Sequence, residues 1–287
     1  MSESTVGVIG GSGLYEIEGI RVLEERAIDT PFGKPSDAFI VGEIEGQRVI
    51  FLSRHGRGHR RLPSEINFRA NIYGMKLLGV EQIVSASAVG SMKEEYRPTD
   101  LVLPDQFIDR TRHRADTFFG DGIAAHVSLA YPICEEVLDV LSHSARNSGA
   151  TVHVGGTYLC MEGPQFSTRA ESFLYRSWGV DVIGMTNVQE AKLAREAEIC
   201  YSTLALVTDY DCWHETEQHV TVEQVIGYLQ KNAGTAASII LDVVPRLARR
   251  QRTCPCASAM QYAIITDRAM IPEETKERLG PIISRYI

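Results

Sequence analysis

Short runs of apolar and β-branched residues alternate along this chain with segments of helical periodicity, and this alternation constrains the fold more than any other feature. The runs expected to be strands cover residues 6–9, 38–44, 48–53, 82–87, 100–104, 151–160, 181–185 and 200–208. The helical patterns cover residues 64–78, 134–148, 168–178, 187–198 and 221–249. The alternation predicts an α/β fold around a largely buried sheet. We expect one domain over residues 1–287, with a small helical extension from about residue 250.

Composition limits the classes of partner. The net charge of −8 argues against a general nucleic-acid binder, because no overall field attracts a polyanion. No stretch approaches the roughly 20 apolar residues of a membrane span. The opening Met-Ser-Glu-Ser is not followed by the apolar segment of a signal peptide. A cytoplasmic protein without membrane or nucleic-acid partners is therefore expected.

The chain has six cysteines. Four stand alone in apolar or mixed surroundings, where reduced buried thiols are expected: Cys134, Cys160, Cys200 and Cys212. Cys254 and Cys256 flank Pro255 in a polar segment and could be a redox pair, half of a metal site, or two incidental thiols. A four-ligand zinc site would need partners that the sequence does not offer nearby, so no metal is expected.

A glycine loop follows the first expected strand, in the sequence VGVIGGSGL over residues 6–14. Such a loop lets an anion approach backbone N–H groups closely. The dinucleotide fingerprint fails, because Gly11-Ser12-Gly13 is followed by Leu-Tyr-Glu, and the triphosphate loop fails because no Gly-Lys-Ser/Thr follows. What remains is a loop that presents the hydroxyl of Ser12 and backbone N–H groups to an anion.

Two further strand ends carry polar residues. Arg54 and His55 follow the run 48–53, and Ser87 lies in the segment Ser-Ala-Ser-Ala-Val-Gly-Ser over residues 85–91. Arginine matches phosphate oxygens in a bidentate manner, and a histidine adds a donor. A solvated basic loop is the alternative for residues 54–61. No acidic magnesium motif lies beside these segments, so three strand ends together predict one pocket for a free phosphate rather than a triphosphate.

Two carboxylates, Asp209 and Asp211, follow the last expected strand. One residue apart on an extended strand end, they would point to the same side. If buried near each other, their pKa values should separate, with one raised towards neutrality. The alternative is a pair of solvated loop acids.

Several ordered segments resemble the trimeric purine nucleoside phosphorylases, most closely the branch that acts on methylthioadenosine. The resemblance covers residues 6–245 and rests on residues 30–37 (TPFGKPSD), 105–111 (DQFIDRT), 162–171 (EGPQFSTRAE), 184–186 (GMT) and 208–213 (TDYDCW). It implies a mixed, distorted β-sheet flanked by helices. It also implies a homotrimer or dimer of trimers, with inorganic phosphate as co-substrate and no metal or organic cofactor.

The resemblance also assigns site residues. Phosphate would be bound by Ser12, Arg54, His55, Ser87, the backbone around Ala88, and Thr186. Phe166 would stack near the base, Met185 would pack beneath the ribose, and Ser167 would lie close to the base or the phosphate. A protonated Asp209 would donate to purine N7, and Asp211 would accept from the 6-amino group, which favours adenine.

The 5′ group of the substrate is the last feature that the resemblance addresses. Relatives that act on ordinary nucleosides tend to carry a histidine at the position of Val222. The face formed by Val222, Val225 and Ile226 is apolar here and suits a methylthio group, whereas a hydroxyl would lose its water without gaining a partner. His126 matches a residue that a neighbouring subunit lends to this pocket.

The expected reaction is phosphorolysis of S-methyl-5′-thioadenosine to adenine and 5-methylthioribose 1-phosphate. Gly184 and Asn187 depart from the usual pattern of that branch and resemble some 6-oxopurine enzymes. A phosphorylase for 6-oxopurine nucleosides or methylthioinosine therefore stays open. So do a hydrolase that uses water and a nucleoside-binding module without activity, because a fold can be retained when its chemistry changes.

Overall fold

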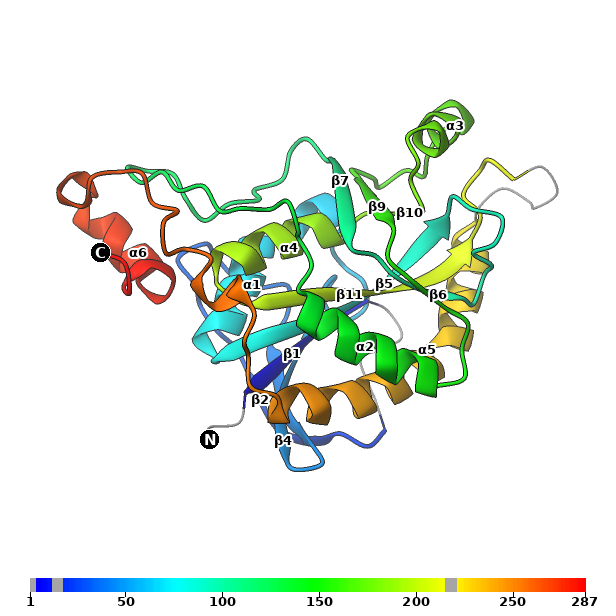
Figure 1. The fold of residues 1–287 in the computed structure, drawn as a ribbon, viewed down its shortest axis with the longest axis horizontal. Helices are drawn as coiled ribbons and strands as arrows, with labels where there is room; N and C mark the ends of the chain where they lie inside the picture. Colours follow the sequence, from blue (N-terminus) through cyan, green and yellow to red (C-terminus); the bar gives the residue numbers. More distant parts are fainter. Residues whose placement is uncertain (1–3, 12–17, 215–220) are drawn as a thin grey trace.

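The computed structural model describes residues 4–11, 18–214 and 221–287, and these build a mixed sheet of eleven strands with helices on both faces (Figure 1). The α/β fold is confirmed. The strands are β1 (Thr5–Gly10), β2 (Arg21–Arg26), β3 (Phe39–Ile44), β4 (Gln47–Ser53), β5 (Val80–Ser91), β6 (Leu101–Leu103), β7 (Gln106–Arg110), β8 (Val152–Val154), β9 (Thr157–Met161), β10 (Val182–Gly184) and β11 (Cys200–Asp209). The α-helices are α1 (Phe68–Leu77), α2 (Glu135–Asn147), α3 (Arg169–Ser177), α4 (Asn187–Glu196), α5 (Val222–Arg249) and α6 (Glu273–Ile283).

The strand order explains how distant segments meet. The sheet runs β2-β3-β4-β1-β5-β10-β9-β7, and β11 pairs with β5. The neighbours β4, β1, β5 and β11 are parallel, so their carboxyl ends lie at one edge of the sheet. At its far end β5 turns to an antiparallel pairing with β10, which makes the sheet mixed. Loops that follow parallel strands therefore gather at one edge.

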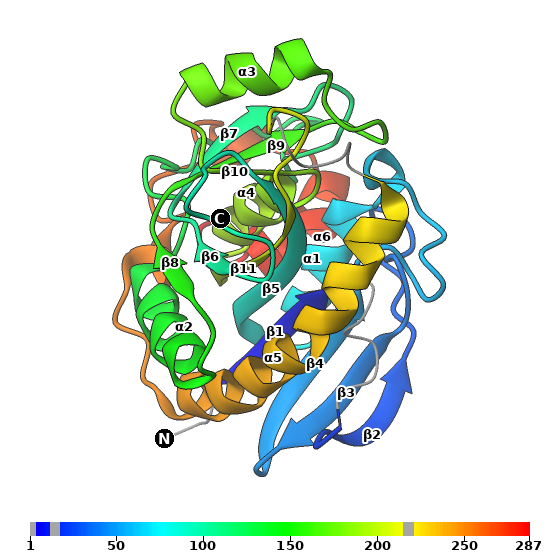
Figure 2. The ribbon, with the colours of Figure 1, turned by 90° about the vertical axis from the view of Figure 1, so that its right-hand side faces the viewer.

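Two apolar layers cover the sheet (Figure 2). On one face, α2 and α5 contribute Leu141 and Val243 to a core shared with β1 and β11. On the other face, α1, α4 and α6 contribute Met75, Leu193 and Leu279. Burial on both faces is why the central strands appear in the sequence as nearly continuous apolar runs.

The structure differs from the predicted elements in several strands. β5 runs from Val80 to Ser91, beyond the run predicted over residues 82–87, so Ser87 lies within the strand and not at its end. The edge strand β2 is not among the predicted strands, because all of its residues are exposed and no apolar alternation marks it. The short strand β7 is not among them either. The single strand expected over residues 151–160 is divided into β8 and β9 by Gly155 and Gly156, whose φ values of +88° and +114° interrupt an extended chain.

Residues 250–287 form the C-terminal extension. It contains short 3₁₀ turns at Pro255–Ser258 and Arg268–Met270, followed by α6. An isolated bridge between Ala125 and Ile264 joins the extension to the segment of residues 111–134, which we call the strap. Among the described residues, no helix is both long and apolar enough to cross a membrane.

Candidate active site

Arg54 links the ends of β4 and β1 to the middle of β5, because β5 does not end near Ser87 as predicted but continues to Ser91. It follows β4, and its backbone N–H donates to the carbonyl of Gly10 at the end of β1 (2.9 Å). Its side chain is 1% exposed and reaches β5, where Nη1 donates to the Ala86 carbonyl (2.9 Å) and Nη2 to Ser85 Oγ (2.5 Å). The second and third polar segments found in the sequence are therefore brought together, as predicted.

A buried carboxylate that the sequence did not reveal, Glu190 of α4, holds the Arg54 guanidinium. Arg54 Nε lies 2.6 Å from Glu190 Oε1, and both side chains are only 1% exposed. Glu190 Oε2 also accepts from Ser85 Oγ (2.6 Å) and Tyr201 Oη (2.8 Å). Glu190 therefore neutralises the charge of Arg54 and fixes the orientation of its guanidinium.

Arg54 has donor capacity left near Gly11. An arginine side chain carries five N–H donors, and one hydrogen of Nη1 has no acceptor among the described residues. A Cβ placed on Gly11 would lie 3.8 Å from Nη1, so this nitrogen lies close to the start of the loop. Ser12 itself lies outside the described residues.

His55 is positioned as a neutral acceptor. Its Nδ1 lies 2.9 Å from the Arg61 carbonyl, which can only accept, so Nδ1 carries the proton. The ring stacks on His59 with centroids 4.1 Å apart. Burial lowers the pKa of His55 to about 4, with the nearby Arg54 charge adding to the effect. The ring N–H is therefore already in use and Nε2 is left to accept, while a role of His55 in phosphate binding stays a prediction.

Ser87, Thr186 and the hydroxyl of Tyr158 provide neutral polar groups near these residues. The hydroxyls of Ser87 and Tyr158 face each other in a buried region, but neither makes a well-aligned hydrogen bond within the described part of the chain. Ala88 follows Ser87 on β5 and is partly exposed. Thr186 is the N-cap of α4 and makes no side-chain capping bond. An unpartnered buried hydroxyl is costly, and a helix N-terminus favours an anion.

Gly184 and Asn187, the two positions that resemble 6-oxopurine enzymes, are each explained by packing within this subunit. A Cβ on Gly184 would lie 1.9 Å from Tyr158 Oη, so the tyrosine requires glycine there. Asn187 is fully buried and its Nδ2 donates to Tyr201 Oη (2.8 Å) and Thr203 Oγ1 (3.1 Å). Both residues therefore support the structure beneath the site.

The acid pair lies at the end of β11, but not by the geometry that the sequence suggested. Asp209 ends the strand, whereas Asp211 lies in a turn with φ of +51°. The backbone N–H of Asp211 donates to Asp209 Oδ1 (2.8 Å), and Thr208 Oγ1 donates to Asp209 Oδ2 (2.7 Å). The two carboxylates are therefore brought together by a turn rather than by alternation along an extended strand.

Burial raises the pKa of both acids. The pKa of Asp209 is raised to about 6, chiefly by desolvation and additionally by the negative charge of Asp211. The pKa of Asp211 is raised by burial, against hydrogen bonds from Ser172 and Ser167 that lower it. Gly90 allows this packing, because a Cβ there would lie 2.8 Å from Asp209 Oδ1. The expected upward shift is confirmed for Asp209.

The loop that precedes α3 lies beside the acid pair. The thiol of Cys212 donates to the carbonyl of Ser167 (3.3 Å), which ties this loop to the turn that contains Asp211. Phe166, next to Ser167, is 44% exposed. An exposed aromatic ring beside buried acids is available to contact a ligand.

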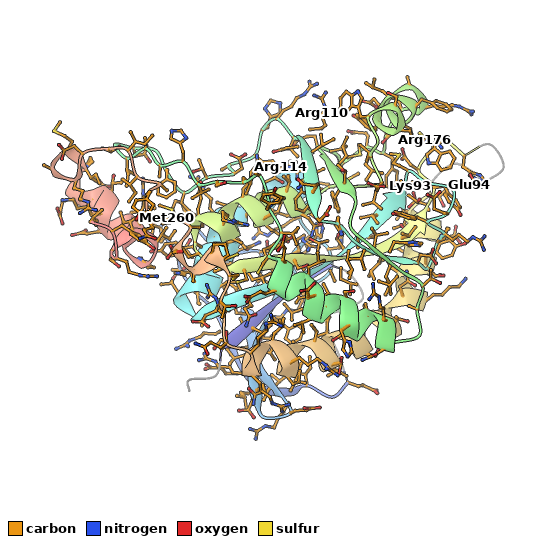
Figure 3. The ribbon with its side chains drawn as sticks, in the orientation of Figure 1. Lys93, Glu94, Arg110, Arg114, Arg176 and Met260 are labelled. Atoms are coloured by element: carbon orange, nitrogen blue, oxygen red, sulfur yellow. The ribbon has the colours of Figure 1, made fainter. Side chains whose placement is uncertain are left out.

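Arg114 of the strap is a second residue that the sequence did not reveal (Figure 3). Its side chain is 1% exposed and pairs with Glu162, Nε to Oε1, at 3.2 Å. Its Nη1 donates to the Met185 carbonyl and to Gln189 Oε1 (3.0 Å). Arg114 therefore fixes the backbone of Met185 against the end of β9. No sequence signal marked it, because it is one of several arginines in an irregular segment.

The first turns of α5 present apolar side chains outward. Val222 is 63% exposed, Ile226 is 47% exposed and Val225 is partly buried. Further along the helix, Asn232 Nδ2 lies 3.4 Å from the Val207 carbonyl, which places α5 along the end of β11. The apolar face of α5 is thus exposed to solvent over its first turns, and further along the helix it packs in the core.

His126 lies in a different part of the subunit. It is exposed on the strap, where its backbone N–H donates to the Ala263 carbonyl of the C-terminal extension (2.9 Å). Figure 1 shows α6 of the extension at the opposite end of the molecule from the residues that follow β11, and the middle of the strap reaches this extension. The structure therefore does not bring His126 to the acid pair of its own chain.

Comparison with known proteins gives consistent matches. Residues 5–245 match the model of the phosphorylase superfamily. An S-methyl-5′-thioadenosine phosphorylase of Geobacter sulfurreducens is 60% identical over 286 residues, covering 99% of this chain and 100% of that protein. The crystal structure of a methylthioadenosine phosphorylase from an antarctic soil metagenomic library has a TM-score of 0.93 at 49% identity, covering 99% of this chain and 100% of that one.

A more distant solved structure agrees. The methylthioadenosine phosphorylase of Schistosoma mansoni in complex with adenine has a TM-score of 0.84 at 33% identity and covers 98% of both chains. The polar residues around Arg54 and the acid pair therefore lie on a scaffold shared with these enzymes. This chain belongs to the phosphorylase superfamily and, within it, to the S-methyl-5′-thioadenosine phosphorylase family.

Proposed function

We propose that this chain catalyses the phosphorolysis of S-methyl-5′-thioadenosine to adenine and 5-methylthioribose 1-phosphate. The observation that supports this most strongly is the buried acid pair, in which the pKa of Asp209 is raised to about 6. A carboxyl with a raised pKa keeps its proton to a higher pH than an ordinary aspartate does, and while it is protonated it can donate to a purine nitrogen. The reaction belongs to purine and methionine salvage, and we place it in the cytoplasm.

Phosphate would bind beside the carboxyl ends of β1 and β4 and the adjoining middle part of β5. We assign the free Nη1 hydrogen of Arg54, the hydroxyls of Ser12, Ser87 and Thr186, and the backbone around Ala88 as donors. His55 Nε2 would accept from a protonated phosphate oxygen. Because Glu190 already neutralises Arg54, oriented dipoles and the N-terminus of α4 would provide most of the stabilisation of the anion.

The nucleoside would lie between this pocket and the acid pair. Protonated Asp209 donates to N7 and makes adenine a better leaving group, while ionised Asp211 accepts from the 6-amino group. Phe166 and Ser167 would line the base, and Met185 the ribose. The exposed apolar side chains of Val222, Val225 and Ile226 would contact the 5′-methylthio group.

The chemistry needs positioning, a nucleophile and a proton donor. A phosphate oxygen attacks the anomeric carbon on the face opposite the purine as the glycosidic bond breaks, through a transition state of oxocarbenium character. The electron pair of that bond leaves with adenine, which Asp209 protonates. Phosphate is the only co-substrate that this sequence of steps requires, so we assign no metal or organic cofactor to it.

Adenine release from S-methyl-5′-thioadenosine, measured with and without inorganic phosphate, tests the proposal. We expect release only when phosphate is present, with one 5-methylthioribose 1-phosphate formed per adenine. Release of adenine in phosphate-free buffer would show a hydrolase instead. Binding of the nucleoside without any adenine release would show a binding module.

We also propose a homotrimer or a dimer of trimers, in which His126 of the partner subunit completes the 5′ pocket. Two exposed apolar regions at different ends of the molecule support this. One is on α3, with Phe173, Leu174 and Trp178, and the other is on the C-terminal extension, with Tyr262 and Ile265. Two different surfaces that pair head to tail close into a ring when the rotation between neighbouring subunits is 120° for a trimer.

Sedimentation velocity combined with activity measurement tests the assembly. We expect a trimer or hexamer to carry the activity, and His126→Ala to raise the KM for the nucleoside while leaving the KM for phosphate unchanged. A monomer with full activity would contradict the assembly, and so would an unchanged nucleoside KM in the His126→Ala enzyme.

A further inference from the structure

Four cysteines from three distant parts of the chain meet at one point, far from the candidate active site. Cys134 is the N-cap of α2, and Cys200 begins β11. Cys254 and Cys256 lie on either side of Pro255, at the start of the C-terminal extension. All four Sγ atoms lie within 4.8 Å of one another, and Cys200 Sγ lies 3.3 Å from Cys254 Sγ. The two partners that the sequence did not offer near Cys254 and Cys256 are therefore supplied by the fold.

The spacing of the sulfur atoms suits a tetrahedral metal ion. Thiolate sulfurs bound to zinc at about 2.3 Å lie about 3.8 Å from one another. The four sulfurs here are spaced closely enough to reach that arrangement by small side-chain rotations. Four soft sulfur donors in a tetrahedron favour zinc over magnesium or calcium, which bind oxygen ligands.

The backbone around the cysteines is held by bonds that need no metal. The N–H of Cys134 donates to the Tyr201 carbonyl (2.9 Å), which fixes the start of α2 against β11. Thr253, just before Cys254, donates to the carboxylate of Glu136 through both its N–H and its hydroxyl. The donor positions are thus largely preorganised, which reduces the entropy lost on metal binding.

The position of the cluster indicates a structural role. Cys134, Cys200 and Cys256 are at most 4% exposed, and the four sulfurs fill all four positions of a tetrahedral ion, leaving none for a substrate. Cys200 and Asp209 are the first and last residues of β11. At about 3.3 Å per residue they are about 30 Å apart. An ion here would not touch the nucleoside or the phosphate.

We propose that Cys134, Cys200, Cys254 and Cys256 bind one zinc ion, which fastens the start of the C-terminal extension to the corner formed by α2 and β11. Each thiol releases its proton to solvent as its Zn–S bond forms, and the completed site carries a charge of −2. The extension lies outside residues 5–245, which match the superfamily model. The ion would therefore attach an element added to the common scaffold.

Metal analysis of the purified chain tests the site. The protein is prepared anaerobically with a thiol reductant and without chelator, and its metals are quantified per chain by mass spectrometry. We expect about one zinc per chain, lost in the Cys254→Ser/Cys256→Ser variant. The zinc should be retained in the Cys160→Ala variant, which removes a buried cysteine outside the cluster. The double variant should keep its kcat with S-methyl-5′-thioadenosine at moderate temperature.

Wild-type protein gives a second measurement that does not depend on how the variants fold. Cobalt(II) added to metal-free protein should give the thiolate charge-transfer absorption of a tetrahedral site, and zinc should remove that absorption stoichiometrically. A chelator should lower the melting temperature of the wild type but not of the double variant. Metal-free protein that retains six free thiols would overturn the proposal, as would paired disulfides among the four cysteines or iron in place of zinc.

Discussion

Replacing Arg54 by lysine is expected to raise the apparent KM for phosphate by about 10- to 100-fold. The guanidinium bonds Glu190 and Ser85, and one Nη1 hydrogen close to Gly11 has no acceptor among the described residues. A lysine ammonium cannot reproduce this planar arrangement of several N–H donors. One hydrogen bond to a charged group is worth about 1.5–3 kcal/mol, which corresponds to that range of affinity. Initial rates over a range of phosphate concentrations, at saturating nucleoside, measure the effect.

A matched set of variants separates loss of phosphate binding from loss of stability. Arg54→Ala leaves Glu190 as an unpaired buried charge, which should cost about 3–5 kcal/mol of unfolding free energy. Arg54→Ala/Glu190→Gln removes that charge and should recover much of the stability without recovering phosphate binding. Arg57→Ala, in the same loop but 55% exposed at its side chain, should leave the KM unchanged. An unchanged phosphate KM in the Arg54→Lys enzyme would refute the phosphate site.

Replacing Asp209 by asparagine is expected to reverse the base preference. In the wild type, kcat/KM should be higher for S-methyl-5′-thioadenosine than for methylthioinosine or inosine. The asparagine amide donates to the O6 of a 6-oxopurine but cannot protonate N7, so the preference should shift towards 6-oxopurines. An unpaired hydrogen bond costs about 1–3 kcal/mol, or roughly ten- to a hundredfold in rate. Steady-state rates with the three nucleosides measure the shift.

The Asp209→Asn substitution should also change the pH dependence of kcat/KM. Donation to N7 requires protonated Asp209, whose pKa is raised to about 6. The wild-type kcat/KM should therefore fall as the pH rises above about 6, and this alkaline limb should be absent from the Asp209→Asn enzyme. Asp139→Asn, an exposed change on α2, should keep both the limb and the base preference. A wild type that cleaves inosine as well as S-methyl-5′-thioadenosine would contradict the role of the acid pair.

Much of the fold could be predicted because it is encoded locally. The pattern over residues 221–249 predicts α5 within one residue of its observed bounds, since an apolar stripe of period 3.6 occurs only in a helix. The run over residues 200–208 predicts β11 in the same way. β2 was not predicted, because an exposed edge strand needs no apolar pattern. Arg54 could be found as a site candidate because it follows a recognisable strand, and Ser87 because it ends the apolar run over residues 82–87, although β5 itself continues to Ser91.

Only the tertiary structure decided which groups meet at these strand ends. Glu190 pairs with Arg54 across 136 positions of the chain, and Arg114 reaches Met185 across 71. Neither partner could be identified from local periodicity, because strand order and helix packing determine which distant residues become neighbours. Burial also depends on that packing. The raised pKa of Asp209 could therefore be predicted only on the assumption that Asp209 and Asp211 are buried close together. The sequence by itself determined the strands, the helices and the polar residues at their ends, whereas the fold determined their partners, because pairing and desolvation arise only when distant segments pack together.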